Sequence, residues 1–380
     1  MESVLIANRG EIAVRIIRAA AERGLRTIAV YSELDRDAVH VELADEAWNI
    51  GPAPAADSYL NITRIIEVAQ ESGADAIHPG YGFLAENADF AQAVLDAGVT
   101  WIGPPPAAIA TMGDKIASRR AAIEAGVEGV PGSIDPVTAA AEVRRIGDDI
   151  GYPIAIKAAH GGGGKGLKIV HDPDEIEDAF ESARRESDAW FASPDVYVER
   201  YLEKTRHIEA QVLFDNDGNG VFLGERDCSA QRRHQKLIEE TPAVGVTDAQ
   251  RSILGEKALA IASAAGYQNA GTVEFLLSEN GEFYFLEMNT RLQVEHTITE
   301  VVTGIDIVHA QFVVAEGGPL PVTETPPTRG HAIEMRINAE DPARGFAPTP
   351  GDVVEYREPG GYGVRVDSGV RRGSTVSQYY

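Results

Sequence analysis

The chain is poor in cysteine and in positive charge, and each shortage excludes a class of function. Its 380 residues include one cysteine, Cys228, so neither an internal disulfide nor a zinc site built from several cysteines can form. Such cysteine usage is typical of a reducing compartment, and we expect a cytoplasmic location. The 34 lysines and arginines face 59 aspartates and glutamates, for a net charge of -25. A general nucleic-acid-binding protein needs a basic surface, so nucleic acid is not expected as a partner.

Leader peptides and long apolar runs are also missing from the sequence. The first residues, MESVLIANRG, lack the basic stretch and long apolar run of a signal peptide. No apolar stretch approaches the length needed to cross a membrane, so no membrane partner is expected. With 44% hydrophobic and 24% charged residues, the composition is that of a soluble globular protein. The length allows two or three domains.

The first third of the chain alternates strand and helix patterns. Apolar strand patterns at 4–7, 27–31, 74–78 and 99–103 are separated by helical patterns such as 11–23. This alternation predicts a doubly wound parallel sheet, which we assign to a Rossmann-like domain over residues 1–113. The first turn carries one glycine, Gly10, so the dinucleotide-binding fingerprint is absent. That absence disfavours an NAD-dependent oxidoreductase.

The pattern changes after the proline-rich break at 103–106. A helix ending near residue 150, strands at 153–159, 167–170 and 196–199, and a helix at 174–185 predict a small α+β unit. Longer strand patterns follow it. A proline-rich stretch at 319–327 then precedes a β-rich tail that starts at His331. We therefore predict a second domain over 114–320 and a third unit over 330–380.

A glycine run, 160–166, lies between two predicted strands. It is not a P-loop, because no Ser or Thr follows Lys165, and a strand rather than a helix follows Gly166. A glycine loop between antiparallel strands can fold over nucleotide phosphates. Gly163, Gly164 and Gly166 would let backbone N–H groups approach the oxygens, while Lys165 adds charge. The alternative is a flexible hairpin tip.

A hairpin is predicted over residues 272–291, because two apolar runs flank Asn280-Gly281. A two-residue turn there would place three pairs of residues opposite each other: Glu279 and Glu282, Leu276 and Phe285, and Glu274 and Glu287. Facing carboxylates repel unless a cation lies between them. Asn289 falls on the same face as Glu287 and would add a third oxygen ligand, which suits Mg²⁺ or Mn²⁺. The alternative is a solvated edge with glutamates pointing at water.

Other charged residues lie close to these segments. Lys157 ends an apolar strand and needs a partner such as phosphate, unless it reaches the surface, and Lys115 is a weaker candidate of the same kind. The basic cluster 231–236 could gather an anionic substrate or form a surface loop. Arg291 could hold a carboxylate-like anion, and Glu295 could act as a general base. A nearby cation would lower the pKa of Glu295, whereas burial would raise it.

Seven segments give the chain a close resemblance to one family. They are IANRGEIAVRIIRA, AIHPGYGFLAEN, IKAAHGGGGKG, ERDCSAQRRHQK, GTVEFL, FLEMNTRLQVEHTITE and EMRINAED. In this order the chain resembles the biotin carboxylases, the ATP-grasp components of acetyl-CoA, propionyl-CoA and pyruvate carboxylases. The resemblance implies an α/β and α+β fold. A Rossmann-like pre-ATP-grasp domain would be followed by an ATP-grasp domain, with a mobile glycine-rich lid at about 131–203, and by a partial β-rich C-terminal domain.

The resemblance also implies a reaction and its cofactors. ATP, with Mg²⁺ or Mn²⁺, would phosphorylate bicarbonate to carboxyphosphate, and CO₂ would pass to N1 of biotin on a carrier protein. A separate carboxyltransferase would choose the final acceptor. The nucleotide would be held by Lys115, Lys157, Gly163, Gly164, Lys165, Gly166, Glu199, Leu202, His207, Gln231, His234 and Leu276. The metal ligands would be Glu274, Glu287 and Asn289.

The remaining site residues follow from the same resemblance. Lys236, Arg291, Gln293 and Val294 would hold bicarbonate, and Glu295 would deprotonate it. Arg336 would stabilise the biotin enolate, and Tyr81 would lie near biotin. The family continues past residue 369 into further strands and helices that help form a homodimer, whereas this sequence stops at Tyr380. We therefore expect a partial C-terminal domain, with dimerisation requiring the complete one.

Two other functions stay open at this point. One is a different ATP-grasp ligase that makes an acyl phosphate from another carboxylate, which EMRINAED and RLQVEH disfavour. The other is a nucleotide-binding regulatory subunit without turnover. The set Lys236, Arg291, Glu295 and Arg336 disfavours it, because a sensor needs no bicarbonate site.

Overall fold

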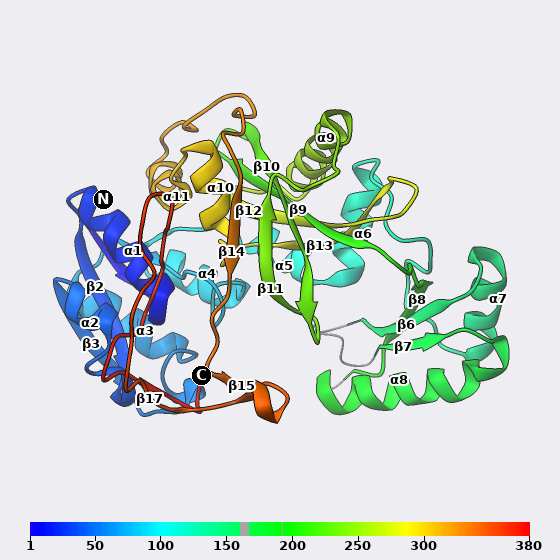
Figure 1. Ribbon diagram of the computed structural model, residues 1–380, viewed down its shortest axis with the longest axis horizontal. Helices are drawn as coiled ribbons and strands as arrows, with labels where there is room; N and C mark the ends of the chain where they lie inside the picture. Colours follow the sequence, from blue (N-terminus) through cyan, green and yellow to red (C-terminus); the bar gives the residue numbers. More distant parts are fainter. Residues whose placement is uncertain (160–166, 192) are drawn as a thin grey trace.

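The computed structural model describes residues 1–159, 167–191 and 193–380. Three sheets follow one another along its length. A parallel sheet lies at one end, a long antiparallel sheet lies in the middle, and a small antiparallel sheet lies at the other end (Figure 1). This mixed α/β arrangement confirms the predicted fold class.

The parallel sheet has the order β3-β2-β1-β4-β5. Its strands are β1 (Ser3–Ile6), β2 (Arg26–Ser32), β3 (Glu46–Gly51), β4 (Ala76–His78) and β5 (Thr100–Trp101), and all neighbours pair in parallel. Helices α1 (Gly10–Glu22), α2 (Val39–Leu43), α3 (Ile62–Ser72) and α4 (Ala88–Asp96) connect them. The four predicted strands are present. The sequence pattern missed β3, because it is a half-buried edge strand without an apolar run.

The central sheet has the order β13-β12-β9-β10-β11-β14. Its strands are β9 (Arg206–Phe214), β10 (Gly220–Arg232), β11 (Gln235–Thr241), β12 (Asn269–Leu277), β13 (Phe283–Asn289) and β14 (Ala332–Met335). One face packs on α5 (Pro106–Gly113), α6 (Lys115–Glu124) and α9 (Asp248–Ala264) through residues such as Ile208, Ala210 and Val212. Side chains alternate along β9, so His207, Glu209 and Gln211 point to the opposite face. That second face carries the polar residues described below.

Two helices follow β13 and join the central sheet to the N-terminal domain. They are α10 (His296–Thr303) and α11 (Ile307–Ala315). Phe312 and Val308 of α11 pack in one core with Leu213 of β9 and with Ile12 and Ile16 of α1. In the described residues, no single helix is long and apolar enough to span a membrane, and α10 with α11 passes that test only as a pair bent by 95°.

The small α+β unit consists of β6 (Ile154–Ala158), β7 (Lys168–Val170), β8 (Val196–Arg200), α7 (Ala140–Ile150) and α8 (Ile176–Phe191). It has its own apolar core, built from residues such as Ile154, Ile156, Phe180 and Val198. β6 pairs with β7 and with β8 in antiparallel fashion. The glycine run therefore connects antiparallel strands, as predicted, although Gly163, Gly164, Lys165 and Gly166 themselves lie outside the described residues.

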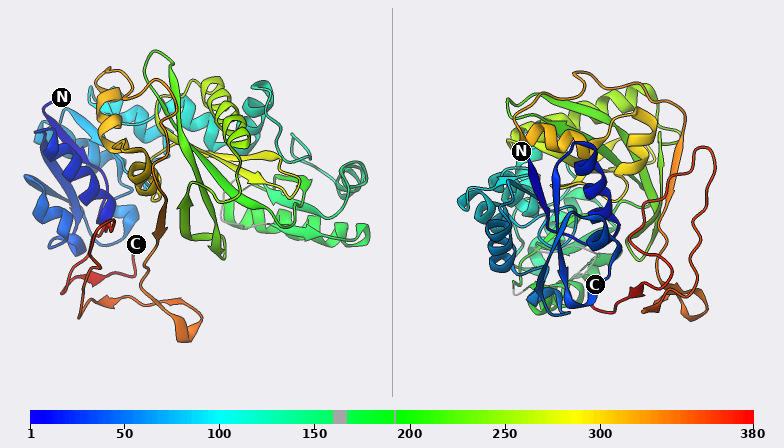
Figure 2. Two further views of the ribbon diagram at one scale, coloured as in Figure 1. Left: turned by 45° about the horizontal axis from the view of Figure 1, so that its top comes forward. Right: turned by 90° about the vertical axis from the view of Figure 1, so that its left-hand side faces the viewer.

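The tail beyond β14 runs back toward the N-terminal domain (Figure 2). Its strands are short pairs: β15 (Glu340–Asp341) with β16 (Ala347–Pro348), and β17 (Gly351–Asp352) with β18 (Thr375–Val376). At its end, the ring of Tyr380 packs edge-on against Tyr59, and the Arg9 guanidinium lies 4.5 Å from the centre of the Tyr380 ring. The end of the tail therefore packs against the N-terminal part of the chain.

The β12–β13 hairpin corrects the predicted turn. Ser278 N–H donates to Glu282 O at 3.0 Å, so the loop has three residues, with Gly281 at φ 85°. Leu276 therefore faces Tyr284 rather than Phe285, and Glu279 lies in the loop rather than opposite Glu282. A β-bulge next to Glu274 then adds one residue on β13 and restores the register. Glu274 faces Glu287 as predicted, because the bulge cancels the error in the turn.

Candidate active site

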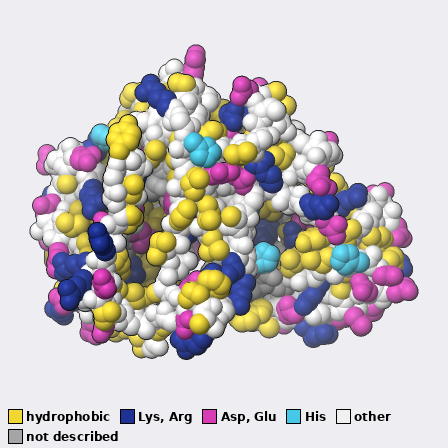
Figure 3. All heavy atoms as spheres, in the orientation of Figure 1, with side chains coloured by type: hydrophobic (Ala, Val, Ile, Leu, Met, Phe, Trp, Pro, Cys, Tyr) yellow, Lys and Arg dark blue, Asp and Glu magenta, His cyan; other side chains and the backbone are white. Residues whose placement is uncertain are grey.

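A cavity of about 1400 Å³ lies in front of the polar face of the central sheet. The small α+β unit, the loop after β4, the segment after β13 and the tail also contribute to its walls. The space-filling view shows the surface hollowed on both sides of the central strands, with lysine and arginine side chains near the hollow beside the small unit (Figure 3). Residues far apart in the sequence therefore meet around one space.

Most of the predicted site residues line this cavity. They are Tyr81, Lys115, Lys157, Glu199, His207, Gln231, His234, Lys236, Glu274, Leu276, Glu287, Asn289, Arg291, Gln293, Val294, Glu295 and Arg336. Leu202, which follows β8, is not among the lining residues. The structure thus brings together residues from the loop after β4, from α6, from every strand of the central sheet except β14, and from the small unit.

One end of the cavity gathers cations. Lys115 and Arg119 lie one turn apart on α6, and Lys157 ends β6. Glu199 on β8 accepts hydrogen bonds from Lys157 and from Arg119 Nη1, the latter at 3.1 Å. Lys157 therefore points at a buried partner, and its side chain is only partly exposed. Burial lowers the pKa of Lys157 to about 8, and Lys115 and Arg119 add to that effect. Positive charge in such excess favours an anionic ligand.

The other end is built around Lys236. Its Nζ donates to Glu209, to Glu274 at 2.8 Å and to Glu295 at 2.9 Å. Burial would raise the pKa of Glu274, but Lys236 and His207 lower it well below its usual range. Burial would likewise raise the pKa of Glu295, but Lys236, Arg226 and Arg336 outweigh it and lower the value to about 2. The neighbouring cations therefore outweigh burial, and Glu295 is a carboxylate.

The two facing carboxylates of the hairpin lie in the same cavity. Asn289 Nδ2 donates to Glu274 Oε1 at 2.7 Å, and Glu274 is 4% exposed. A solvated edge is therefore the wrong interpretation. Burial raises the pKa of Glu287, and the nearby Glu274 raises it further. Among the described residues, no hydrogen bond reaches the Glu287 carboxylate. A carboxylate pair of this kind fits a hard divalent cation, whereas the amide oxygen of Asn289 accepts a hydrogen bond from Arg291.

The segment after β13 carries the next group. Arg291 Nε donates to Glu86 at 2.8 Å, and Arg291 Nη2 donates to Asn289 Oδ1 at 2.8 Å. The side chain of Gln293 donates from Nε2 to Glu274 at 3.0 Å. Every one of these groups is oriented by a partner within the protein, so the arrangement exists before a ligand binds.

Arg336 lies in the segment after β14 and contacts the group around Lys236. Its Nε donates to Glu239 at 2.7 Å, and its Nη2 donates to Glu295 at 3.0 Å. Tyr81 hydrogen-bonds to Glu11, and burial raises the pKa of its hydroxyl. The guanidinium of Arg336 and the carboxylate of Glu295 are thus in direct contact.

Comparisons with known proteins place the chain in a family. The family model "Biotin carboxylase, N-terminal domain" matches residues 1–109, "Carbamoyl-phosphate synthase L chain, ATP binding domain" matches 114–323, and "Biotin carboxylase C-terminal domain" matches 334–380. The chain is 53% identical to the biotin carboxylase of Haemophilus influenzae, over 100% of this chain and 85% of that protein. The chain belongs to the biotin carboxylase family.

Other relatives extend the comparison. The biotin-dependent acyl-coenzyme A carboxylase alpha3 subunit of Mycobacterium leprae is 55% identical over 98% of this chain, which spans 62% of that protein. The biotin carboxylase of Campylobacter jejuni, solved as a beta-gamma-ATP complex, is 46% identical with a TM-score of 0.96, over 100% of this chain and 85% of that one. The biotin carboxylase domain dimer of Hydrogenobacter thermophilus 2-oxoglutarate carboxylase, solved with MgADP, ADP and bicarbonate, is 47% identical with a TM-score of 0.94, over 100% and 84%.

Several charged residues of this biotin carboxylase site were missed by the sequence reasoning. They are Glu86, Arg119, Glu209, Arg226 and Glu239, which contact Arg291, Glu199, Lys236, Gln293 and Arg336 respectively. Glu209 could have been found, because His207, Glu209 and Gln211 alternate with apolar residues in one strand. The other four meet their partners only through the tertiary fold, and no local pattern marks them.

Proposed function

We propose that this chain catalyses the ATP-dependent carboxylation of biotin carried on a carrier protein, with bicarbonate as the carboxyl donor. The observation that carries the proposal is one cavity with a cation cluster at one end and the Lys236–Glu295–Arg336 group at the other. Family membership supports it, as do solved relatives that hold MgADP and bicarbonate. We take 1–113, 114–320 and 330–380 as its domains, with a lid at about 131–203.

The cation cluster is proposed to hold the nucleotide. Lys115 and Lys157 would bind phosphate oxygens, with Arg119 beside them. The remaining nucleotide contacts would come from Glu199, Leu202, His207, Gln231, His234, Leu276 and the glycine run with Gly163, Gly164, Lys165 and Gly166. Because the cluster carries more positive than negative charge without a ligand, a polyphosphate would stabilise it.

Glu274, Glu287 and Asn289 are proposed to hold Mg²⁺ or Mn²⁺. When bound, the ion supplies positive charge that neutralises phosphate oxygens. The fit rests on the paired carboxylates and on the raised pKa of Glu287, which a neighbouring cation would reverse.

Lys236, Arg291, Gln293 and Val294 are proposed to hold bicarbonate, and Glu295 to accept its proton. A bicarbonate oxygen then attacks the terminal phosphorus of ATP and ADP leaves, which gives carboxyphosphate. Carboxyphosphate would break down to CO₂ and phosphate, the phosphate would accept the N1 proton of biotin, and N1 would attack CO₂ to form the new N–C bond. Arg336 would stabilise negative charge on the biotin oxygen, and Tyr81 would lie beside the ring.

The partners follow from this reaction. We propose a biotin carboxyl carrier protein or domain, a carboxyltransferase that takes the carboxyl group from biotin, and a homodimer when the C-terminal domain is complete. The cytoplasmic location stays a prediction.

The test is ATP cleavage with and without bicarbonate and free biotin. We expect ADP release to depend on bicarbonate and to rise when biotin is added. Turnover stimulated by a different carboxylate would favour another ATP-grasp ligase. Nucleotide binding without any turnover would favour a regulatory subunit.

A further inference from the structure

We propose that Arg226 is a positioning residue for bicarbonate, which it orients from beneath the cavity through Gln293 and Glu209. The inference rests on the proposed function, in which Gln293 and Lys236 hold that anion. Arg226 itself does not line the cavity.

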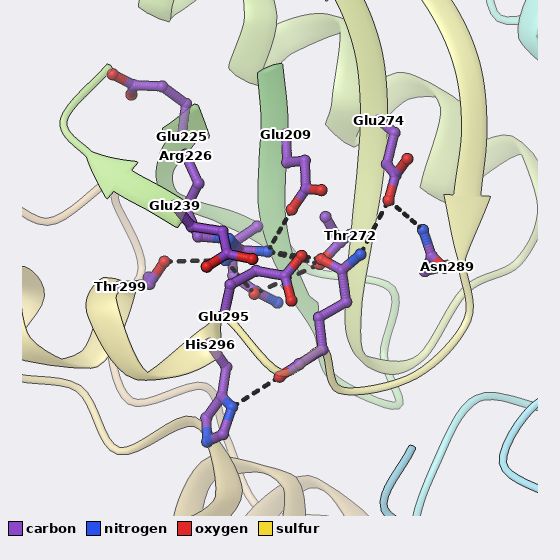
Figure 4. A network of polar contacts seen from close by, with 12 residues as sticks. Glu209, Glu225, Arg226, Glu239, Thr272, Glu274, Asn289, Glu295, His296 and Thr299 are labelled. Carbon is purple, nitrogen blue, oxygen red and sulfur yellow. Dashed lines mark hydrogen bonds and ion pairs between the residues drawn. The ribbon is translucent and has the colours of Figure 1, made fainter. Parts of the chain in front are cut away.

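Arg226 lies on β10 and is 0% exposed. Its two terminal nitrogens share acceptors from four separate parts of the fold, as Figure 4 shows. Nη1 donates to Gln211 Oε1 at 2.8 Å and to Thr299 Oγ1 at 2.9 Å. Nη2 donates to Gln293 Oε1 at 2.7 Å, to Thr272 Oγ1 at 3.1 Å and to Glu209 Oε2 at 3.2 Å. One planar group therefore fixes two strands, a helix and the segment after β13 relative to one another.

The contact with Gln293 decides which end of its amide faces the ligand. Arg226 holds the amide oxygen, so the amide nitrogen is directed to the other side, where it donates to Glu274 at 3.0 Å. Among the described residues, the second hydrogen of this nitrogen has no acceptor, and Gln293 lines the cavity. If the amide turned over, its oxygen would face the bicarbonate oxygens and repel them. Arg226 thus presents a donor where the anion needs one.

The contact between Arg226 and Glu209 orients Lys236, which also binds Glu209. Glu209 is 0% exposed and receives Arg226 on one oxygen and Lys236 on the other. Without the guanidinium, the carboxylate of Glu209 would be free to turn, and the Lys236 ammonium would follow it. Both of the groups that Arg226 controls belong to the bicarbonate site, whereas the nucleotide cations Lys115 and Lys157 have no contact with it in the described structure.

An arginine is needed because its planar fork can serve several acceptors at fixed angles. A lysine at the same position keeps the charge that balances Glu209 but offers one nitrogen atom. A methionine keeps much of the volume and removes every donor. The two replacements therefore separate loss of geometry from loss of charge.

The experiment measures initial rates of ADP release for Arg226→Lys and Arg226→Met. Bicarbonate is varied at saturating MgATP, and MgATP is varied at saturating bicarbonate. We expect the KM for bicarbonate to rise about tenfold in Arg226→Lys and about a hundredfold in Arg226→Met, the range seen when a supporting contact is removed. The KM for ATP should stay within about twofold. A purely structural role would move both KM values and kcat together.

Two further variants sharpen the test. Arg251→Met is the matched control, because Arg251 pairs with Glu225, the neighbour of Arg226 whose side chain leaves the opposite face of β10 (Figure 4). It should lower the melting temperature and leave the KM for bicarbonate unchanged. In a Gln293→Ala background, Arg226→Lys should raise the KM for bicarbonate by less than it does in the wild type.

The outcomes decide between the claims. A KM for bicarbonate within twofold of wild type in folded Arg226→Lys and Arg226→Met overturns the positioning role alone. Fully additive effects of Arg226→Lys and Gln293→Ala also overturn it. If Arg226→Met does not fold, Arg226→Lys decides. A wild-type chain that never responds to bicarbonate overturns the proposed function together with this inference.

Discussion

The two ends of the cavity have opposite balances of charge. At the nucleotide end, Lys115, Lys157 and Arg119 crowd around Glu199, and positive charge exceeds negative charge until a ligand arrives. At the bicarbonate end, Lys236 sits among Glu209, Glu274 and Glu295, so carboxylates outnumber the central ammonium. The first cluster gains from an anion, whereas the second is held together by its own ion pairs. On the proposed assignment of the two ends, the difference predicts that phosphate binding is driven by charge and that bicarbonate is selected by preorganised geometry.

The largest effect is expected for Lys236→Met, which breaks the bicarbonate end. Three buried carboxylates would lose their shared ammonium, so we expect stability to fall by about 3–5 kcal/mol at neutral pH. Bicarbonate-dependent turnover should fall by at least about 10³-fold. Urea unfolding and ADP release measure the two losses.

The matched control for Lys236→Met is Lys204→Met, because Lys204 pairs with Glu279 on the exposed surface at 3.6 Å. That variant should lose less than about 1 kcal/mol. Equal losses in the two lysine variants would contradict the view that the buried ion pairs hold this end together.

Arg336→Met tests the two half-reactions at the bicarbonate end. Removing the guanidinium should lower biotin-stimulated turnover by about 10²–10³-fold, the scale of one lost electrostatic donor. Bicarbonate-dependent ATP cleavage without biotin should fall much less, although Arg336 contacts Glu295 and some loss is expected. A proportional loss of both activities would assign Arg336 to the ATP step or to structure alone.

Glu287→Gln tests the place where the two ends meet. One charge fewer should weaken divalent-cation binding and lower activity by about 10–100-fold. Stability without metal should hold or rise, because repulsion with Glu274 is relieved. Thermal melts with and without Mg²⁺-ATP give the readout, with the exposed Glu279→Gln as control. Equal stabilisation by Mg²⁺-ATP in Glu287→Gln and in the wild type would exclude the metal role.

The smallest effect is expected for Glu334→Gln. Burial raises the pKa of Glu334 to about 8, and Glu239 and Glu295 add to the rise, so the folded protein binds a proton more tightly than the unfolded chain does. The free energy of unfolding of the wild type should therefore fall by about 1–2 kcal/mol as the pH rises from about 5 to 8. In Glu334→Gln this fall should be absent. Chemical denaturation at several pH values measures it, and parallel slopes would contradict the assignment.

Periodic signals explain what the sequence predicted well. The apolar strands around Leu5, Val30, Ile77 and Trp101 repeat with helices between them, and that pattern is local. The strand of Trp48 was missed because an edge strand is only half-buried and lacks an apolar run. The predicted β-rich tail contains strands of only two residues beyond β14.

Contacts between distant segments explain what the sequence could not give. The Glu274–Glu287 pair was predicted from a two-residue turn that does not exist. A β-bulge, which no local sequence pattern predicts, brings the two residues opposite each other. The segments that carry Glu86 and Glu239 meet Arg291 and Arg336 only in the folded chain. Resemblance supplied candidate roles, whereas the partners that orient those residues came from tertiary structure.

The most direct measurement is the formation of carboxybiotin from labelled bicarbonate and free biotin. We predict ATP-dependent transfer of the label to biotin, which Glu295→Gln abolishes because the base that accepts the bicarbonate proton is lost. ATP cleavage without any labelled biotin, in a folded protein supplied with Mg²⁺, would contradict the account.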